Sequence, residues 1–185
     1  MNIFSFLMIM QSIIIGIGIS ELLTNFSSAL KKYRLKKIGL ITPMLTVMLF
    51  LALLQMFWET WSLQGEVTWT FPALVLMVAG PIIVHMMAHV LYPNADDEKP
   101  PTEYYLSKSS LFWSLGVVAV ITSVLFRPLG LGKELFIIDN FTNAPLLIGF
   151  IVLIFNKNIW LHRVAAVVFT VLILADTIFI NYQIN

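Results

Sequence analysis

Long apolar stretches, separated by short polar segments, make up most of the chain. An α-helix needs about 20 mostly apolar residues to cross the hydrocarbon core of a bilayer. By this measure the pattern predicts six transmembrane helices, over Ile3–Thr24, Gly39–Ser62, Phe71–Tyr92, Ser110–Leu129, Asn143–Phe155 and Trp160–Tyr182. The fifth stretch is short, so we expect it to tilt little, to thin the bilayer, or to begin earlier in the chain.

Prolines and one polar linker divide the predicted helices. Pro81 lies inside the third helix and should kink it, which frees a backbone carbonyl one turn earlier. The segment of residues 93–109 opens with PNADDEKPPTEYY, which is acidic and rich in proline. We expect this linker to be extended, solvated and cytoplasmic, with three helices before it and three after it.

Composition indicates the same class of protein. The 185 residues are 59% hydrophobic and only 11% charged, with a mean hydropathy of +0.90, whereas soluble domains carry about 25% charged residues. We therefore predict an all-α polytopic membrane protein, with residues 1–185 in a single six-helix bundle. A net charge of +1 without a basic groove argues against nucleic acid as a partner. The absence of cysteine excludes disulfides and thiolate chemistry.

The basic residues indicate an orientation, because loops rich in Lys and Arg stay on the cytoplasmic side. Nine of the 11 Lys and Arg residues follow the first, third and fifth helices or lie just inside the sixth. Only Arg127 and Lys133 fall on the other side. We therefore expect both termini outside the cytoplasm. No Lys or Arg precedes the first apolar run, so we expect a retained helix rather than a cleaved signal peptide.

Two similar segments leave a weak 3+3 inverted repeat open. TPMLTVMLFLALL in the second predicted helix resembles APLLIGFIVLIF in the fifth, and the first and fourth helices keep a similar offset. Three helices per unit would make the two halves inverted, as in many transporters. The third and sixth helices do not keep the offset, and apolar helices match one another by chance.

Polar side chains inside the apolar stretches fall into two layers, which matters because such groups usually face protein or a water-filled cavity. At a rise of about 1.5 Å per residue, an inner layer holds Glu21, Asn25, His85 and His89, and an outer layer holds Glu59, Arg127 and Asp176. Gln11 shares one stripe of its helix with Glu21 and Asn25, and Gln55 shares a face with Glu59. We predict that all nine residues line a polar interior or a path for a ligand or ion.

Glu21 is the most informative of these residues, because it ends an apolar run. Negative charge is disfavoured near the C-terminus of a helix, and the next basic residue, Lys31, comes well after Glu21. A partner must therefore offset the charge. We expect the Glu21 carboxylate to face the bundle and to contact the third helix or a polar group beside it. Gly16 and Gly18, just before Glu21, should let that helix approach closely.

Three interpretations of the inner layer stay open. His85 and His89, one turn apart, could bind Zn²⁺ or another divalent ion together with Glu21. The same residues could form a proton relay, because histidine exchanges protons near neutral pH. We favour a Glu–His hydrogen bond between packed helices, because no HExxH motif accompanies the pair. Apart from a divalent metal we expect no cofactor, and a haem held with His162 is disfavoured further.

The outer layer has two interpretations. Glu59, Arg127 and Asp176 could form a charged vestibule that attracts a solute or ion. Alternatively, Arg127 could pair with Asp176, with Glu59 as a second acceptor, and so lock the helices together. We favour the structural ion pair, because all three side chains lie close enough to the membrane surface to reach it.

Part of the chain resembles a known group of proteins. GIGISELLTNF, the basic loop after it and QMFWETWSL resemble a family of small, uncharacterised bacterial polytopic inner-membrane proteins. The likeness covers residues 1–70. It implies a bacterial inner membrane, with both termini periplasmic on the orientation above, and it implies no chemistry. His85 and His89 are not part of the pattern, which weakens the metal interpretation.

Three classes of function remain. The first is a transporter or channel-like protein for a small solute or ion, with the polar interior as its path. The second is a non-transporting accessory or sensor subunit that docks a partner through its helix faces and the Asp96–Glu103 linker. The third is a metal-dependent membrane enzyme built on Glu21, His85 and His89. Besides the lipid bilayer, a homo-oligomer or a membrane partner protein is the partner these classes allow.

Overall fold

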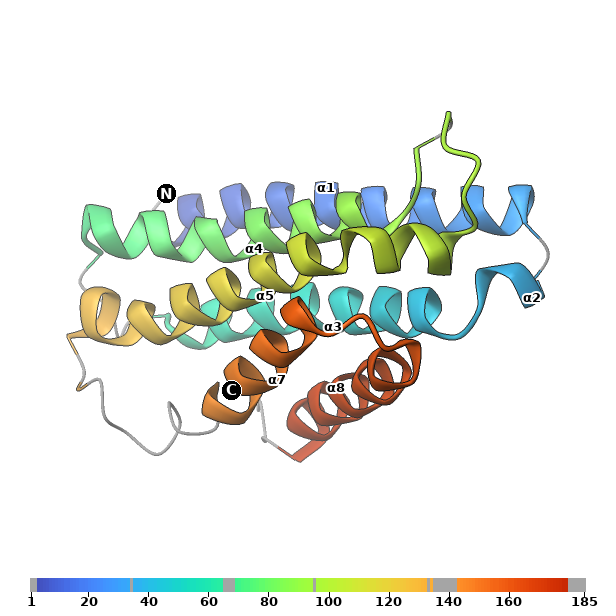
Figure 1. The fold of residues 1–185 in the computed structure, drawn as a ribbon. Helices are drawn as coiled ribbons and strands as arrows, with labels where there is room; N and C mark the ends of the chain where they lie inside the picture. The colour runs from blue at the N-terminus through green and yellow to red at the C-terminus, as the bar shows by residue number, and fades with distance from the viewer. Residues whose placement is uncertain are drawn as a thin grey trace.

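The computed structural model describes residues 3–33, 35–64, 69–94, 96–132, 134 and 143–179. The regular structure of these residues is entirely helical (Figure 1). The helices are α1 (Ile3–Lys32), α2 (Leu35–Ile38), α3 (Ile41–Ser62), α4 (Phe71–Leu91), α5 (Pro101–Leu131), α7 (Asn143–Phe155) and α8 (Ile159–Phe179). The predicted all-α class is therefore confirmed.

Four helices, α1, α3, α4 and α5, are long and apolar enough to cross a membrane. The chain is therefore an integral, multi-pass membrane protein that contacts lipid through its helices. α7 and α8 are also apolar but shorter by this measure. With 13 residues, α7 spans about 20 Å, which is less than the roughly 30 Å of a hydrocarbon core.

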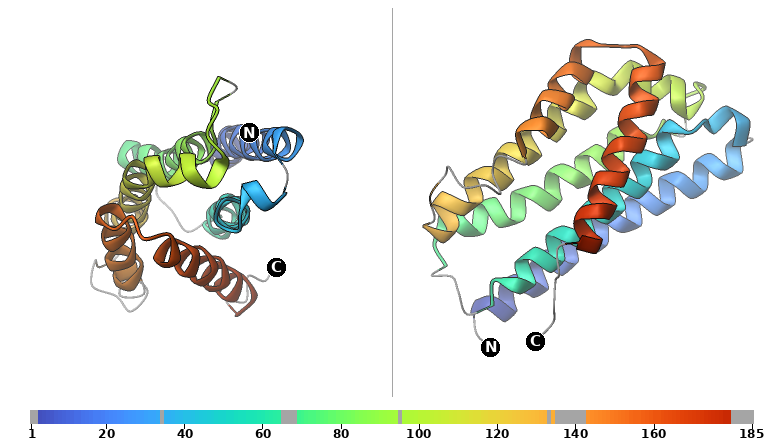
Figure 2. Two further views of the ribbon diagram at one scale, coloured as in Figure 1. Left: turned by 45° about the vertical axis from the view of Figure 1, so that its right-hand side comes forward. Right: turned by 90° about the horizontal axis from the view of Figure 1, so that it is seen from below.

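The helices form a ring in cross-section (Figure 2). α1 packs against α3 and α4, α4 packs against α5, α5 against α7, and α3 against α8. α7 and α8 diverge from the short loop that joins them, as Figure 2 shows, and make few contacts with each other. The fold does not show the 3+3 inverted repeat, because α3 and α4 pack along each other whereas α7 and α8 diverge.

Two helix ends differ from the prediction. α1 continues from Thr24 to Lys32, so Lys31 and Lys32 occupy its last turn, where positive charge is favourable. α5 begins at Pro101 rather than Ser110. Proline is well suited to the first turn of a helix, and Glu103 adds favourable negative charge there.

The predicted linker over residues 93–109 is therefore wrong in its second half, which is helical and partly buried. Tyr105 and Ser109 are both fully buried in the first turns of α5. The non-helical part is also held in place: Lys32 Nζ donates to the Asp97 carbonyl at 2.8 Å, and Tyr33 donates to the Lys99 carbonyl at 3.0 Å. Helix α5 starts early because burial of Tyr105 in its first turns stabilises the helical conformation. The local proline content of the sequence gives no indication of this burial.

The centre of the bundle is filled by leucines from three helices. Leu22, Leu45, Leu49, Leu53 and Leu91 belong to one buried cluster. A Cβ atom added at Gly18 of α1 would lie 3.2 Å from the Leu53 side chain and 3.6 Å from the His85 Cβ. Gly18 therefore allows the close approach of α3 and α4 that the sequence indicated. Gly16 does not, because nothing lies within 4 Å of the corresponding Cβ position.

A buried chain of hydrogen bonds joins α5 to α8 and to the loop before α8. His162 Nε2 lies 2.8 Å from the Asn156 carbonyl, which can only accept, so Nε2 carries the proton and Nδ1 accepts. Tyr105 donates to that Nδ1 at 2.8 Å and accepts from Trp113 Nε1 at 2.8 Å. The three side chains are fully buried. His162 is thus a neutral structural residue, and its role depends on two aromatic partners far away in sequence.

Lys157 holds the same loop against α5. Its Nζ donates to Ser109 Oγ at 2.9 Å, to Ser110 Oγ at 3.0 Å and to the Leu106 carbonyl at 3.3 Å. Ser110 in turn donates to the Ile154 carbonyl of α7 at 2.7 Å. These bonds satisfy carbonyls at the end of α7 and fix the position of the divergent helices α7 and α8.

Candidate functional site

A cavity of about 90 Å³ lies among α1, α3, α4 and α5, toward the end of the bundle where α3 ends and α4 begins. A water molecule occupies about 30 Å³ of liquid, so the cavity has room for a small ligand or a few waters. Its described lining consists of Gln11, Met56, Glu59, Thr60, Leu63, Leu76, Met77, Gly80, Pro81, Ala119, Thr122, Ser123 and Phe126. Four helices therefore contribute to one site.

Gln11 is the key residue of this cavity. Its side chain is only 1% exposed, and its Nε2 donates to the Met56 carbonyl at 3.3 Å. Because a carbonyl oxygen can only accept, the amide nitrogen must face Met56 and Oε1 must face away from it. Oε1 is buried and has no hydrogen-bond partner in the described structure. A buried acceptor without a partner is unfavourable by about 1–3 kcal/mol, so a ligand that donates to it would be stabilising.

Two threonines add further acceptors to the lining. Thr60 donates its hydroxyl hydrogen to the Met56 carbonyl at 2.9 Å, and Thr122 donates to the Val118 carbonyl at 2.8 Å. Each hydroxyl hydrogen is used within its own helix, so each oxygen offers only lone pairs to the cavity. Glu59 is exposed and accepts from Gln55 Nε2 at 3.3 Å. The polar lining is therefore dominated by oxygen atoms that accept.

The proline of α4 contributes backbone to the same cavity. Pro81 is buried inside the helix, and it has no N–H to donate to the Met77 carbonyl one turn earlier. Gly80 also lines the cavity and has no side chain, so it presents backbone atoms there. Thr70 caps the start of α4 by accepting from the Ala73 N–H at 3.3 Å. The freed carbonyl expected from Pro81 thus belongs to a residue of the cavity wall.

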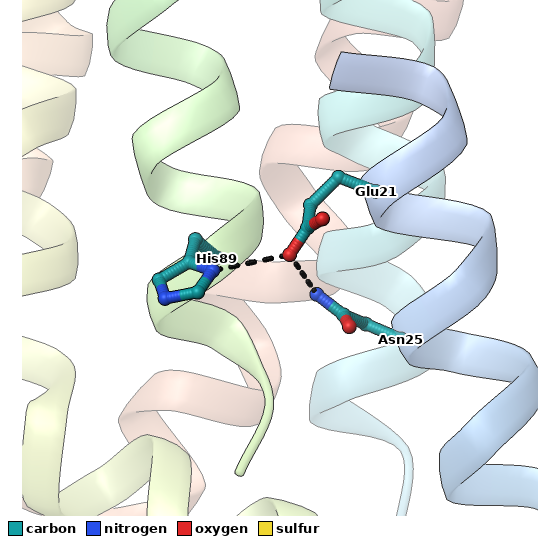
Figure 3. Close-up of polar contacts among 3 residues, drawn as sticks. All are labelled: Glu21, Asn25 and His89. Carbon is teal, nitrogen blue, oxygen red and sulfur yellow. Dashed lines mark hydrogen bonds and ion pairs between the residues drawn. The ribbon is translucent and has the colours of Figure 1, made fainter. Parts of the chain in front are cut away.

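A second polar cluster joins α1 to α4 near the opposite end of the bundle (Figure 3). His89 Nδ1 lies 3.1 Å from Glu21 Oε1, which also accepts from Asn25 Nδ2 at 2.9 Å. The expected contact between Glu21 and the helix that carries the two histidines is therefore present. The side chains of His89 and Glu21 are 62% and 31% exposed, so the pair lies on an open seam between two helices rather than in a closed interior.

His85 lies on α4 one turn before His89, and it does not complete a metal site. Its Nδ1 is buried and has no hydrogen-bond partner in the described structure. Among the described residues, no group of three or more His, Asp or Glu side chains is placed to hold a metal ion. Glu21, His85 and His89 all belong to that part of the chain, so the arrangement does not fit the predicted divalent ion.

The structure thus divides the predicted polar residues between two sites. Gln11, Glu59 and the adjacent Gln55 belong to the cavity end, and Glu21, Asn25, His85 and His89 belong to the seam. The side chains of Arg127 and Asp176 lie outside the part that the structure describes, so the predicted outer ion pair stays a prediction. Sequence reasoning missed Met56, Thr60 and Thr122 as site residues. The only signal for the two threonines is a hydroxyl near the end of an apolar helix, which is common and unspecific. Met56, whose backbone carbonyl accepts from Gln11, has no signal in the sequence.

Apolar side chains fill the bundle between the two sites. Leu49 and Leu53 of α3 and Val84 of α4 are buried in the central cluster, and Leu53 packs against Gly18 beside His85. Closely packed leucines exclude water from this region. The cavity is therefore separated from the seam by apolar packing.

Comparison of the chain with protein-family models, with curated proteins and with solved structures finds no match. No family is therefore identified, and the likeness of residues 1–70 to small bacterial membrane proteins remains a resemblance.

Glu21 and His89 should stabilise the protein modestly through their mutual contact. Glu21→Leu should lower the free energy of unfolding by about 1 kcal/mol, because two donors lose an acceptor but both stay partly exposed. Glu21→Gln should cost less, since its amide oxygen still accepts. A double-mutant cycle with His89→Leu, measured by unfolding in mixed micelles, should give a coupling energy of about 0.5 kcal/mol. A coupling energy of zero would show that the contact contributes nothing.

Proposed function

We propose that the protein binds a small polar solute or ion in the cavity around Gln11, and that it acts as a receptor or accessory subunit rather than as an open channel. The observation that carries this proposal is Gln11, which lines a cavity and whose buried Oε1 has no hydrogen-bond partner in the described structure. Burying such an acceptor is unfavourable unless something donates to it. A bound polar solute can supply that donor, and a bound cation can coordinate the oxygen in its place.

The depth of the cavity supports binding from one side. At about 1.5 Å of rise per residue, Pro81 lies about 15 Å from the start of α4, which is about half of a 30 Å hydrocarbon core. The packed leucines below it, including Leu49 and Leu53, belong to the buried cluster. A ligand that enters from the open end therefore stops near the middle of the membrane.

Transport is the second candidate, and the proline inside α4 favours it. Pro81 lies between the cavity and the seam formed by Glu21 and His89, so a hinge motion there could move one site relative to the other. A transporter would use such a motion to open the cavity alternately to the two sides. An open channel has less support, because it would need a polar path where the described structure has Leu49 and Leu53.

Cysteine accessibility tests the proposal, because the chain contains no cysteine. Ser123 lines the cavity, so a Ser123→Cys variant should react with charged, membrane-impermeant thiol reagents from one side only. The matched control is Ile121→Cys on the same helix, where the side chain is 44% exposed and faces away from the cavity lining. Its thiol should react at least about tenfold more slowly, because these reagents need the thiolate, which lipid disfavours.

The same variants separate binding from conduction. Proteoliposomes that contain the wild-type protein should hold an imposed ion gradient as long as empty liposomes do. Reaction of Ser123→Cys from both sides, together with a rapid loss of the gradient, would contradict a one-ended cavity and favour a channel. A Ser123→Cys thiol that reacts no faster than the Ile121→Cys thiol would contradict the cavity itself.

A further inference from the structure

The polar groups of the cavity are almost all acceptors. Gln11 lines the cavity, turns its nitrogen to the Met56 carbonyl and keeps Oε1 buried without a partner in the described structure. Thr60 and Thr122 have committed their hydrogens to backbone carbonyls of their own helices. No Lys or His side chain belongs to the described lining. A ligand with acceptors of its own, such as an anion or a carbonyl compound, would find few donors in the described wall besides the Ser123 hydroxyl.

The backbone and the charged side chain of the cavity wall also offer mainly hydrogen-bond acceptors. Pro81 removes one N–H from the wall and frees the Met77 carbonyl. Glu59 lines the cavity with a carboxylate, and it is the one acidic side chain in the described lining. Oxygen atoms from amides, hydroxyls, carbonyls and carboxylates are the ligands that hard cations prefer. The lining therefore resembles the coordination shell of a cation more than a site for a neutral solute.

We infer that the ligand of this cavity is a small monovalent cation, either a metal ion of the sodium and potassium class or a protonated amine, held by the oxygens of Gln11, Thr60 and Thr122. This inference rests on the proposed function and names the ligand class. The described lining contains a single carboxylate, that of Glu59, whereas protein sites for divalent ions such as Ca²⁺ generally use several. The volume of about 90 Å³ fits a partly dehydrated ion or a small ammonium group.

Thermal stability of the purified protein in detergent tests this inference. Sodium, potassium, ammonium and methylammonium chloride are compared with tetramethylammonium chloride at constant ionic strength. Tetramethylammonium carries the same charge, but it has no N–H and its methyl groups keep oxygens away. We expect a saturable rise in melting temperature with at least one small cation and none with tetramethylammonium. A response to sodium or potassium alone indicates a metal ion, and a response to the ammonium ions alone indicates a protonated amine.

Matched variants show whether the cavity oxygens hold the cation. Gln11→Met keeps the size of the side chain but removes the acceptor, and it should weaken the apparent affinity at least about tenfold. Thr122→Val removes a cavity oxygen and should also weaken it. The control is Thr42→Val, because Thr42 is equally buried and donates to the Ile38 carbonyl of its own helix but does not line the cavity. Equal stabilisation by every salt, or an unchanged affinity in Gln11→Met, would overturn the inference.

Labelling of Ser123→Cys provides a measurement that does not require a Gln11 variant to fold. The rates with a cationic and an anionic methanethiosulfonate are each divided by the rate with a free thiol, so that only the effect of the site remains. We expect the cationic reagent to be at least about tenfold faster. The assay is repeated with Arg127→Gln, because Arg127 follows Ser123 by one turn along α5. Anionic preference in both backgrounds overturns the cation inference, whereas no reaction with either reagent overturns the cavity itself.

Discussion

Replacing Trp113 by alanine should lower the free energy of unfolding by about 3 to 4 kcal/mol, which is the range for removing a large buried aromatic side chain. The Trp113 ring is fully buried. Its centroid lies 4.8 Å from that of Phe150 on α7 and 5.6 Å from that of Phe169 on α8. The indole N–H also donates to Tyr105. The variant would lose ring contacts to two helices and leave the Tyr105 oxygen without its donor.

The effect should be large because few other contacts hold α7 and α8 together. The two helices diverge and meet where Gly149 approaches the Phe169 ring, at 2.8 Å from the position of an added Cβ, and where the Phe150 and Phe169 rings lie 5.0 Å apart. In lipid, apolar burial against another helix gains little over burial in lipid tails, so close packing and hydrogen bonds decide the stability. Trp113 supplies both at the junction of α5, α7 and α8.

Trp160→Ala is the matched control, because the Trp160 side chain is 66% exposed and leaves no internal cavity when removed. It should cost less than about 1 kcal/mol. Both variants can be measured by unfolding with SDS in mixed micelles, with far-UV circular dichroism as the signal. Equal losses for Trp113→Ala and Trp160→Ala would contradict the view that the aromatic cluster holds the two short helices on the bundle.

The helices themselves could be predicted, because a bilayer imposes a length and an apolar composition on every crossing segment. The residues at which two of the helices begin or end were not predicted correctly. α1 runs on to Lys32 and α5 starts at Pro101, because tertiary contacts stabilise both segments. Tyr105 is buried against Phe112 and His162. The segment PPTEYYLSK contains no pattern that predicts these contacts. A polar, proline-rich segment is typical of a linker, and only its tertiary contacts show that part of it is helical.

The contact of Glu21 was anticipated for a reason that only partly holds. Negative charge near a helix C-terminus does need a partner, but α1 does not end at Glu21. It continues for about three more turns and carries Lys31 and Lys32 in its last turn. Glu21 instead needs partners because it lies within an apolar stretch. The i, i+4 spacing to Asn25 and the nearby α4 supply them, as Figure 3 shows.

The cavity could not be predicted, because it depends on four helices meeting beside Pro81 of α4. The sequence shows Pro81 inside a predicted helix and Gln11 as a polar residue in an apolar stretch. Its neighbours in the structure are Met56 and Thr60 of α3 and Thr122 of α5. Depth alone could not pair these residues, since rotation of each helix about its own axis decides which side chains face the cavity. Whether Gln11 Oε1 has a hydrogen-bond partner therefore depends on these rotations, which the sequence does not specify.

A phosphatase fusion at the C-terminus should be fully active in a bacterial inner membrane, and a fluorescent-protein fusion at the same point should be dark. We propose this topology from the distribution of charge. The end of α1 with Lys31 and Lys32, the α4–α5 linker with Lys99 and the α7–α8 loop with Lys157 lie at one end of the bundle (Figure 2). Loops rich in Lys and Arg remain cytoplasmic. α1 begins at the opposite end.

Aromatic residues gather at that opposite end, as expected of a membrane surface. The Phe4 ring lies 6.5 Å from that of Trp61 and 6.4 Å from that of Trp69. The matched control is a fusion after Asn94 in the α4–α5 linker, which should give the reverse pattern, with a bright fluorescent protein and an inactive phosphatase. Both fusions reporting the same side would contradict a six-helix arrangement, because α7 and α8 would then fail to complete an even number of crossings after α5.

The topology decides which compartment supplies the ligand. The cavity opens toward the end where α1 begins and α3 ends, so C-terminal phosphatase activity would place it on the periplasmic side. Ser123→Cys should then react with impermeant reagents added to intact cells whose outer membrane has been permeabilised, and not with reagents confined to the cytoplasm. If the C-terminal fusion fluoresces instead, the orientation is inverted and Ser123→Cys should be labelled only from inverted vesicles. The cavity and its oxygen lining would be unchanged, but the cation would come from the cytoplasm.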